Sequence, residues 1–217
     1  MEDAVPARDR RMRPGMTRVR LGLAGLLGAV VVATTAVAAD AAPRRYESLE
    51  DLALRLVNCT RTGGWVMRDG TCRGFGSGEH AEYRRPLEFH QGIADEVAWP
   101  WARRIATARY CGHTLAGSSV RERFASAGYA SPLTGENVGC SYAWPPRRMV
   151  IRTHRMMQSE RSSRGWHWRQ MRHRGFTSVG IGVVKVRDQT RIVIDFYGAP
   201  ETVSPPQTVS PPLTVSP

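Results

Sequence analysis

Apolar residues recur every three to four positions in the segment that begins at Ser48, a spacing that predicts an amphipathic helix. Ser48, followed by Asp51, resembles a capping box, so the helix is expected to begin there and to end near Cys59. The predicted inward face consists of Leu49, Leu52, Ala53, Leu56 and Val57.

Three further segments show helical spacing. Residues 94–110 form the longest, and Pro100 predicts a start or a bend near Trp99, because proline removes a helix hydrogen bond. Shorter helices are predicted over residues 118–128 and 147–160. The residues of the longest helix that are expected to face inward are Val97, Trp101, Ile105 and Ala108.

Two segments near the end of the domain, residues 178–187 and 191–198, are rich in Val and Ile and flank a short polar turn at Asp188 and Gln189. They are expected to pair as an antiparallel hairpin. Residues 73–86 are glycine-rich and polar, which predicts a surface loop.

The two ends of the chain have compositions that do not fit a folded domain. Arginines precede an uncharged apolar run over residues 21–39, and small residues follow, so residues 1–42 are expected to form a basic n-region and a cleavable secretory signal. An uncleaved membrane anchor is the alternative, because the run is about long enough to span a bilayer. After cleavage no membrane span is expected. Residues 200–217 repeat a Thr-Val-Ser-Pro-Pro unit and predict a disordered Thr/Ser/Pro-rich tail.

The remaining chain is expected to form one domain over residues 43–199. Its first helix and a hairpin occupy residues 48–72, and its core lies over residues 88–198. Apolar residues make up 41% of the chain, which is enough for a core.

The chain of 217 residues has a formal charge of +12, and Lys185 is its only lysine. So strong a preference for arginine indicates a compositional bias rather than phosphate binding. No nucleic-acid-binding motif accompanies the charge, so nucleic acid is not expected as a partner. The expected consequence is a solvated basic surface, and attraction to an anionic envelope or membrane surface is the alternative.

Four cysteines in an exported chain predict disulfides, because extracellular compartments are oxidising. Three pairings are open, and we favour Cys59–Cys72 with Cys111–Cys140. The first pair closes a short loop that contains turn signals, and it therefore predicts a stapled hairpin. A zinc site is the alternative, but no Cys-x-x-Cys spacing supports it.

Three polar clusters lie beside predicted helix and strand ends: "CGH" at residues 111–113, "GEN" at 135–137, and Glu160 with His167. Together with "SVGIGV", their order and spacing resemble the bacterial branch of the CAP superfamily, which groups cysteine-rich secretory proteins, antigen five and pathogenesis-related proteins. The resemblance covers about residues 48–198. It implies an α+β fold, a three-layer α-β-α sandwich with a small antiparallel sheet, to which we add the two expected disulfides.

The resemblance also implies a cleft lined by His113, Glu136, Glu160 and His167. His113 follows a helix, Glu160 ends one, and His167 is expected in the loop before a strand. Asn137 is expected to structure a tight "GEN" turn through side-chain-to-backbone bonds. In that turn the flanking glycines would press Glu136 towards the cleft, where it can orient a histidine. Capping or hydrogen-bonding roles are expected for the other histidines, His80, His90, His154 and His173.

Two neutral imidazoles can bind a divalent cation such as zinc while carboxylates orient them. His113 and His167 are therefore candidate metal ligands. A hydrogen-bonded network that only holds three loops together is the alternative.

In CAP relatives, grooves between helices are associated with lipid or sterol ligands and with partner recognition. The resemblance therefore favours a secreted cell-envelope module that binds a lipid or a partner. A metal-assisted peptidase or esterase with Glu136 as general base is the second hypothesis. It is disfavoured because no activated Ser or Cys nucleophile and no HExxH motif are present.

A structural envelope protein is the third hypothesis. The residues expected to form an apolar rim are Trp144, Trp166, Trp168 and Met171.

Overall fold

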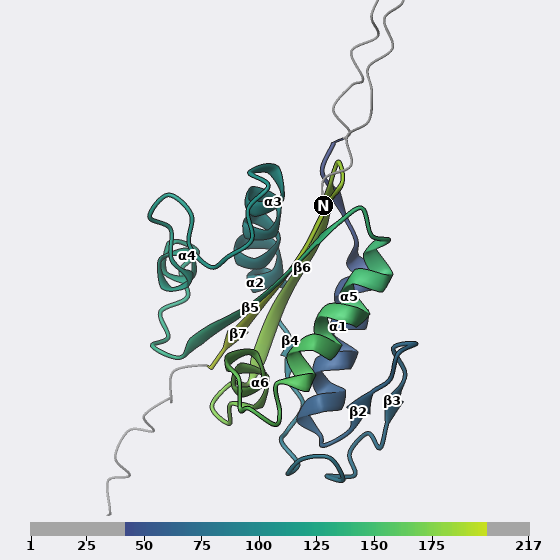
Figure 1. Cartoon of the computed structure of the whole chain (residues 1–217). Helices are drawn as coiled ribbons and strands as arrows, with labels where there is room; N and C mark the ends of the chain where they lie inside the picture. Colours follow the sequence, from purple (N-terminus) through teal and green to yellow (C-terminus); the bar gives the residue numbers. More distant parts are fainter. Residues whose placement is uncertain (1–41, 199–217) are drawn as a thin grey trace, which may run out of the picture. The chain divides into compact units, whose positions relative to one another are not determined.

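A sheet lies between two layers of helices in the part of the chain that the computed structural model describes, residues 42–198 (Figure 1). The predicted signal peptide and the predicted tail lie outside the described residues. The predicted α+β sandwich is confirmed, and within residues 42–198 no helix has the length and apolar character needed to cross a bilayer.

Strands β5 (Thr134–Tyr142), β6 (Ser178–Val186) and β7 (Gln189–Tyr197) form the body of the sheet. Strands β6 and β7 form the predicted antiparallel hairpin, and β5 pairs antiparallel with β7. The short strands β1 (Arg44–Arg45) and β4 (Glu88–Phe89) add to β6, with β4 in the parallel direction. The order β1-β6-β7-β5 leaves β5 at an edge of the sheet.

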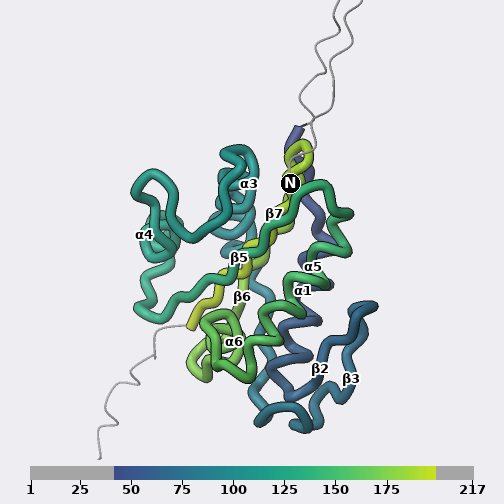
Figure 2. The backbone as a smooth tube through the Cα atoms, in the orientation of Figure 1, coloured from purple at the N-terminus to yellow at the C-terminus, as the bar shows by residue number. Residues whose placement is uncertain are grey.

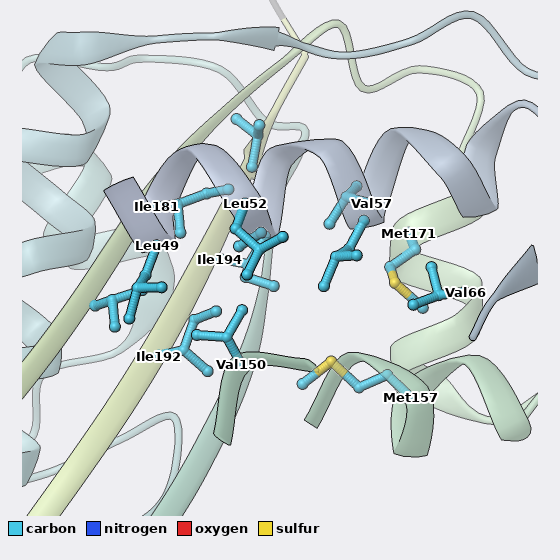
Figure 3. Close-up of a cluster of buried hydrophobic side chains, with 14 of the residues drawn as sticks. Leu49, Leu52, Val57, Val66, Val150, Met157, Met171, Ile181, Ile192 and Ile194 are labelled. Atoms are coloured by element: carbon cyan, nitrogen blue, oxygen red, sulfur yellow. The ribbon is translucent and has the colours of Figure 1, made fainter. Parts of the chain in front are cut away.

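Helices α1 (Glu47–Arg61), α5 (Pro146–Ser159) and α6 (Trp166–Arg172) lie on one face of the sheet. Their apolar sides close over the larger core, as the helical spacing predicts, and Figure 3 shows these side chains converging from α1, α5, α6 and the strands. This core includes Leu49, Leu52, Val57, Val150, Met157, Met171, Ile181, Ile192 and Ile194.

The predicted capping box of the first helix is wrong. Helix α1 begins at Glu47, one residue before Ser48, and has no side-chain cap. The preceding strand explains the difference. The Tyr46 N–H still donates to the carbonyl of Val183 over 3.0 Å, so the chain passes from the sheet into the helix without an intervening loop.

The opposite face is covered by α2 (Gln91–Ile93), the π-helical turn η1 (Ala94–Ala98), α3 (Trp99–Thr107) and α4 (Val120–Ser126). Helix α4 begins with a capping box, in which the Ser119 hydroxyl and the Glu122 carboxylate accept each other's backbone N–H. This layer packs on the sheet through two smaller apolar clusters.

Gly180 and Gly182 of β6 let the second layer approach the sheet closely. A Cβ atom at Gly180 would lie 2.5 Å from the backbone nitrogen of Ala94, and one at Gly182 would lie 2.5 Å from the Cα atom of Trp99. The glycines of "SVGIGV" therefore leave room for helix backbone directly above the strand.

Helix α3 begins at Trp99, so Pro100 lies in its first turn, where a missing N–H is tolerated. The widened π-helical turn ends at Ala98, two residues before this proline. The predicted inward residues Val97, Trp101 and Ile105 are buried. Ala108 is exposed, contrary to the prediction, because the helix ends at Thr107.

The predicted stapled hairpin is present next to the C-terminal part of helix α1. Strand β2 (Trp65–Val66) pairs with β3 (Cys72–Arg73), and the disulfide Cys59–Cys72 ties this pair to the helix. The disulfide fixes the position of the hairpin turn relative to the main core.

His154 of α5 joins α1, α5 and the hairpin in a buried network. Its Nε2 lies 2.9 Å from the Thr60 hydroxyl, which donates to Gln158, and Gln158 bonds the backbone of Val66. Burial lowers the pKa of His154 from 6.5 to about 3, so the ring is neutral. Because the hydroxyl proton goes to Gln158, the ring donates from Nε2. The predicted hydrogen-bonding role is thus confirmed, although the residue is buried.

Candidate functional site

His113 and Glu136 form the first polar pair. The second predicted disulfide, Cys111–Cys140, holds the His113 loop against strand β5. Nδ1 of His113 lies 2.7 Å from Oε1 of Glu136, and the Glu136 side chain is fully buried while 43% of the His113 side chain is exposed. The buried carboxylate therefore orients a ring whose other edge reaches solvent.

Arg123 of α4 binds the second carboxylate oxygen of Glu136. It also donates to the backbone carbonyl of His113 over 3.0 Å, and its guanidinium carbon lies 3.8 Å from the centre of the Trp101 ring. The guanidinium balances the buried negative charge, and the ring beneath it restricts its movement.

His167 and Glu160 form the second pair at the start of α6. Nδ1 of His167 lies 2.6 Å from Oε1 of Glu160, and Oε2 accepts the backbone N–H of His167 over 3.0 Å. A carboxylate at this position satisfies an N–H group that the helix leaves unpaired, and it stabilises the positive end of the helix. Glu160 therefore fixes both the backbone and the ring of His167.

The stretch "TGENVGC" is part of strand β5, and the predicted tight turn is wrong. Side chains alternate along a strand, so Glu136 and Val138 face the α3–α4 layer while Asn137 faces α6. Gly135 does not have a positive φ. A Cβ atom there would lie too close to Oε1 of Gln170 in α6, so this glycine leaves room for that side chain on the strand.

Asn137 connects the second pair to the first. Its Nδ2 donates to the carbonyl of His167 over 3.1 Å, so the predicted side-chain-to-backbone bond reaches a distant helix instead of closing a turn. Figure 2 shows β5 passing between α4 and α6, both of which contact it. Within residues 42–198 no hydrogen bond joins the two His–Glu pairs directly, and their link is the peptide between Glu136 and Asn137.

The loop expected around His167 is helix α6 instead, because its apolar residues have core positions to fill. Met171 is fully buried, and Trp168 packs against the larger core. Trp144 lies beneath arginines of α5, and only Trp166 is mostly exposed, at 56%. The predicted apolar rim is therefore reduced to Trp166 at the surface.

Asp195 of β7 also belongs to the site, although no motif in the sequence pointed to it. It pairs across the strands with Glu136, it is fully buried, and neither of its carboxyl oxygens receives a hydrogen bond from another described residue. Burial, and secondly the charge of Glu136, raise the pKa of Asp195 well above its ordinary value of 3.8. A protonated Asp195 can donate to Glu136, which allows two buried carboxyl groups to lie side by side. The sequence feature that could have identified Asp195 is the single acid inside the apolar strand "RIVIDFYG".

The two pairs leave Nε2 of each histidine without a hydrogen bond from the described residues. In the described part of the chain, no group of three or more His, Cys, Asp or Glu side chains is arranged to hold a metal ion. Each pair therefore leaves one ring nitrogen available to a ligand.

Two solved structures share the architecture at low sequence identity. An extracellular protein containing an SCP domain from Bacillus anthracis is 16% identical, with a TM-score of 0.50 and a match over 70% of this chain and 41% of that protein. An outer surface protein from Borrelia burgdorferi is 13% identical, with a TM-score of 0.51 and a match over 72% of this chain and 98% of that protein. The chain has a CAP-like fold, that of SCP domains.

NaASP2, whose crystal structure was solved with Zn²⁺, is 14% identical with a TM-score of 0.48, and the match covers 72% of this chain and 82% of that protein. At that level of similarity its zinc is not transferred to this chain. Neither a protein-family model nor a curated protein sequence matches the chain. The comparisons establish the fold, and the chain spans 41% of the length of the Bacillus protein.

We expect Asp195→Asn to remove a pH-dependent loss of stability. Because the folded-state pKa of Asp195 is raised, the folded protein holds this proton longer than the unfolded chain. Wild-type stability should therefore fall relative to the variant as the pH rises above 3.8, by up to about 1.4 kcal/mol per pH unit, until the folded-state pKa is reached. Urea unfolding at several pH values measures this difference.

Asp188→Asn is the contrasting variant, in an exposed acid of the β6–β7 turn. A hydrogen bond from Gln189 and the charge of Arg109 hold the pKa of the Asp188 carboxyl below its ordinary value, so wild-type stability should rise relative to this variant as the pH increases, the opposite direction to Asp195→Asn. Wild-type stability that rises relative to Asp195→Asn as the pH increases would show that the folded protein favours an ionised Asp195, and it would contradict the shared proton.

Proposed function

We propose that the protein is an exported CAP-like binding module of the cell envelope, and that it holds a lipid or another envelope component at the His–Glu surface. This surface comprises His113, His167 and Trp166 with the carboxylates that orient the two rings. The observation that supports the proposal is that each ring is fixed at Nδ1 by a carboxylate while its other edge remains partly exposed. Fixed polar groups beside an exposed aromatic residue are typical of ligand sites.

Export is supported by two disulfides in a domain of ordinary size, since such bonds persist mainly outside the cytosol. The Bacillus relative in fold is an extracellular protein and the Borrelia relative is an outer surface protein. Both names agree with the secretory signal that the sequence predicts.

Binding is favoured over hydrolysis by the way in which the candidate groups are engaged. No cysteine of residues 42–198 is free to act as a nucleophile. Both oxygens of Glu136 already bind His113 and Arg123, so this carboxylate is poorly placed to take a proton from an attacking water. These contacts argue against the general-base role considered for Glu136.

We also propose that Nε2 of His113 and Nε2 of His167 are the protein ligands of a divalent cation such as zinc. The two carboxylates support this assignment, because a carboxylate on Nδ1 fixes the tautomer that leaves Nε2 as the ligand atom. A cation held by only two protein ligands would keep open positions, and it would supply a Lewis-acidic point for an anionic headgroup.

Lipid retention tests the binding role. Protein isolated from culture supernatant should carry lipid that solvent extraction and mass spectrometry detect. Trp166→Ala should lower the retained amount several-fold, because a large exposed aromatic surface is lost. Phe75→Ala removes a similarly exposed aromatic side chain from the loop after β3 and should retain the wild-type amount. Lipid-free wild-type protein, or an equal loss in both variants, would count against the role.

Thermal melting with and without zinc tests the cation. Zinc should raise the melting temperature of the wild type, because a ligand that binds the folded state stabilises it. A chelator should reverse the shift, because it removes the cation from the folded protein. His113→Ala or His167→Ala should abolish the shift, and Glu136→Gln should weaken it.

His173→Ala is the control variant, because His173 is exposed outside the two pairs, and it should respond to zinc as the wild type does. If zinc and chelator leave wild-type melting unchanged while the pair variants are merely less stable, the pairs form only a structural network.

A further inference from the structure

Five arginines line a single cavity of about 800 Å³ on the side of the molecule away from the α3–α4 layer. We call it the arginine groove. Four of the arginines come from α5, where positions 148, 152 and 155 share one helical face. The fifth, Arg68, comes from the turn of the β2–β3 hairpin, which the disulfide Cys59–Cys72 fixes. The groove arginines are Arg68, Arg147, Arg148, Arg152 and Arg155.

None of the groove arginines forms an ion pair with a described residue, whereas Arg45, Arg84, Arg109 and Arg123 each bind an acid elsewhere in residues 42–198. Nε of Arg155 is buried without a hydrogen-bond partner. The nearest acid in sequence to Arg68 is Asp69, whose Oδ1 accepts from the backbone and hydroxyl of Thr71. The positive charges thus converge without a counter-ion among the described residues, which gives this surface a positive potential that attracts anions.

Trp144 holds part of the groove in place. The guanidinium carbons of Arg148 and Arg152 lie 5.4 Å and 4.5 Å from the centre of its ring. Stacking reduces the side-chain freedom that binding would otherwise remove, so these donors are partly arranged in advance. Ile151 lies between them and is 8% exposed.

We propose that the arginine groove binds a flexible, non-nucleotide polyanion whose phosphate groups are closely spaced along a chain. Planar guanidinium groups bind phosphate through paired hydrogen bonds. The α5 positions 148 to 155 extend over about 10 Å of helix, which admits two or more phosphates. The site shares no residue with the His–Glu pairs and does not rest on the proposed function.

The shape and the stacking favour this occupant over two others that carry phosphate. A bilayer is nearly flat, and it would not bring its headgroups into a hollow lined from two sides by α5 and the hairpin. A nucleic acid would stack its bases on aromatic rings, but Trp144 already carries Arg148 and Arg152.

Titration calorimetry with inorganic polyphosphate at about 0.15 M salt, a physiological ionic strength, tests the proposal. Wild-type protein should bind it, and the double variant Arg152→Gln/Arg155→Gln should bind at least tenfold more weakly. The matched control, Arg103→Gln/Arg121→Gln, removes the same charge from exposed positions on the opposite layer and should change the affinity less than twofold. Polyphosphate should also slow amide hydrogen exchange in residues 145–156 and 65–73 of the wild type, a readout that needs no variant.

Equal weakening in both double variants would show a general charge effect and overturn the site. The site would also be overturned if a single-stranded oligonucleotide, or vesicles that contain an anionic phospholipid, bound more tightly than polyphosphate at equal phosphate concentration. Absence of wild-type binding would overturn it as well. The His113→Ala variant should bind polyphosphate normally, so failure of the proposed function and failure of the groove are distinguishable.

Discussion

The alternation of side chains along the edge strand β5 determines where the polar groups of the candidate site lie. Glu136 points to one helical layer, where His113 and Arg123 bind it, and Asn137 points to the other, where it binds the His167 backbone. A shift of the strand by one residue would exchange these directions and break both contacts. The site therefore depends on the β5–β7 register, which also places Asp195 beside Glu136.

The burial of Glu136 explains why so many groups surround it. A carboxylate without water needs compensating charge and hydrogen bonds, and Arg123 and the His113 ring supply them. A second buried acid at Asp195 is compatible with this arrangement when it keeps its proton. The contact with His113 that helps to compensate the buried carboxylate also orients the His113 ring. One contact therefore serves both purposes.

Spacing alone predicted the main helices and the β6–β7 hairpin, because α1 and α5 repeat apolar residues at helical intervals and the two strands are rich in Val and Ile. It misjudged β5, where glycine next to Glu136 suggested a turn, although that glycine instead leaves room for the Gln170 side chain of α6. The motif resemblance named the four residues of the two His–Glu pairs, and the way they pair is seen only in the structure. The arginine groove could not be predicted from the sequence, because Arg68 and Arg155 lie together only when tertiary packing brings the hairpin and α5 together.

The central claim is that each carboxylate holds its histidine by Nδ1 and leaves Nε2 free. Long-range ¹H–¹⁵N NMR correlation at a pH where the rings are neutral distinguishes the two tautomers directly. The account predicts that the proton is on Nδ1 in both His113 and His167, and that Glu136→Gln disturbs this preference in His113 alone. A proton on Nε2 in the wild type, or a mixture like that of free imidazole, would contradict it.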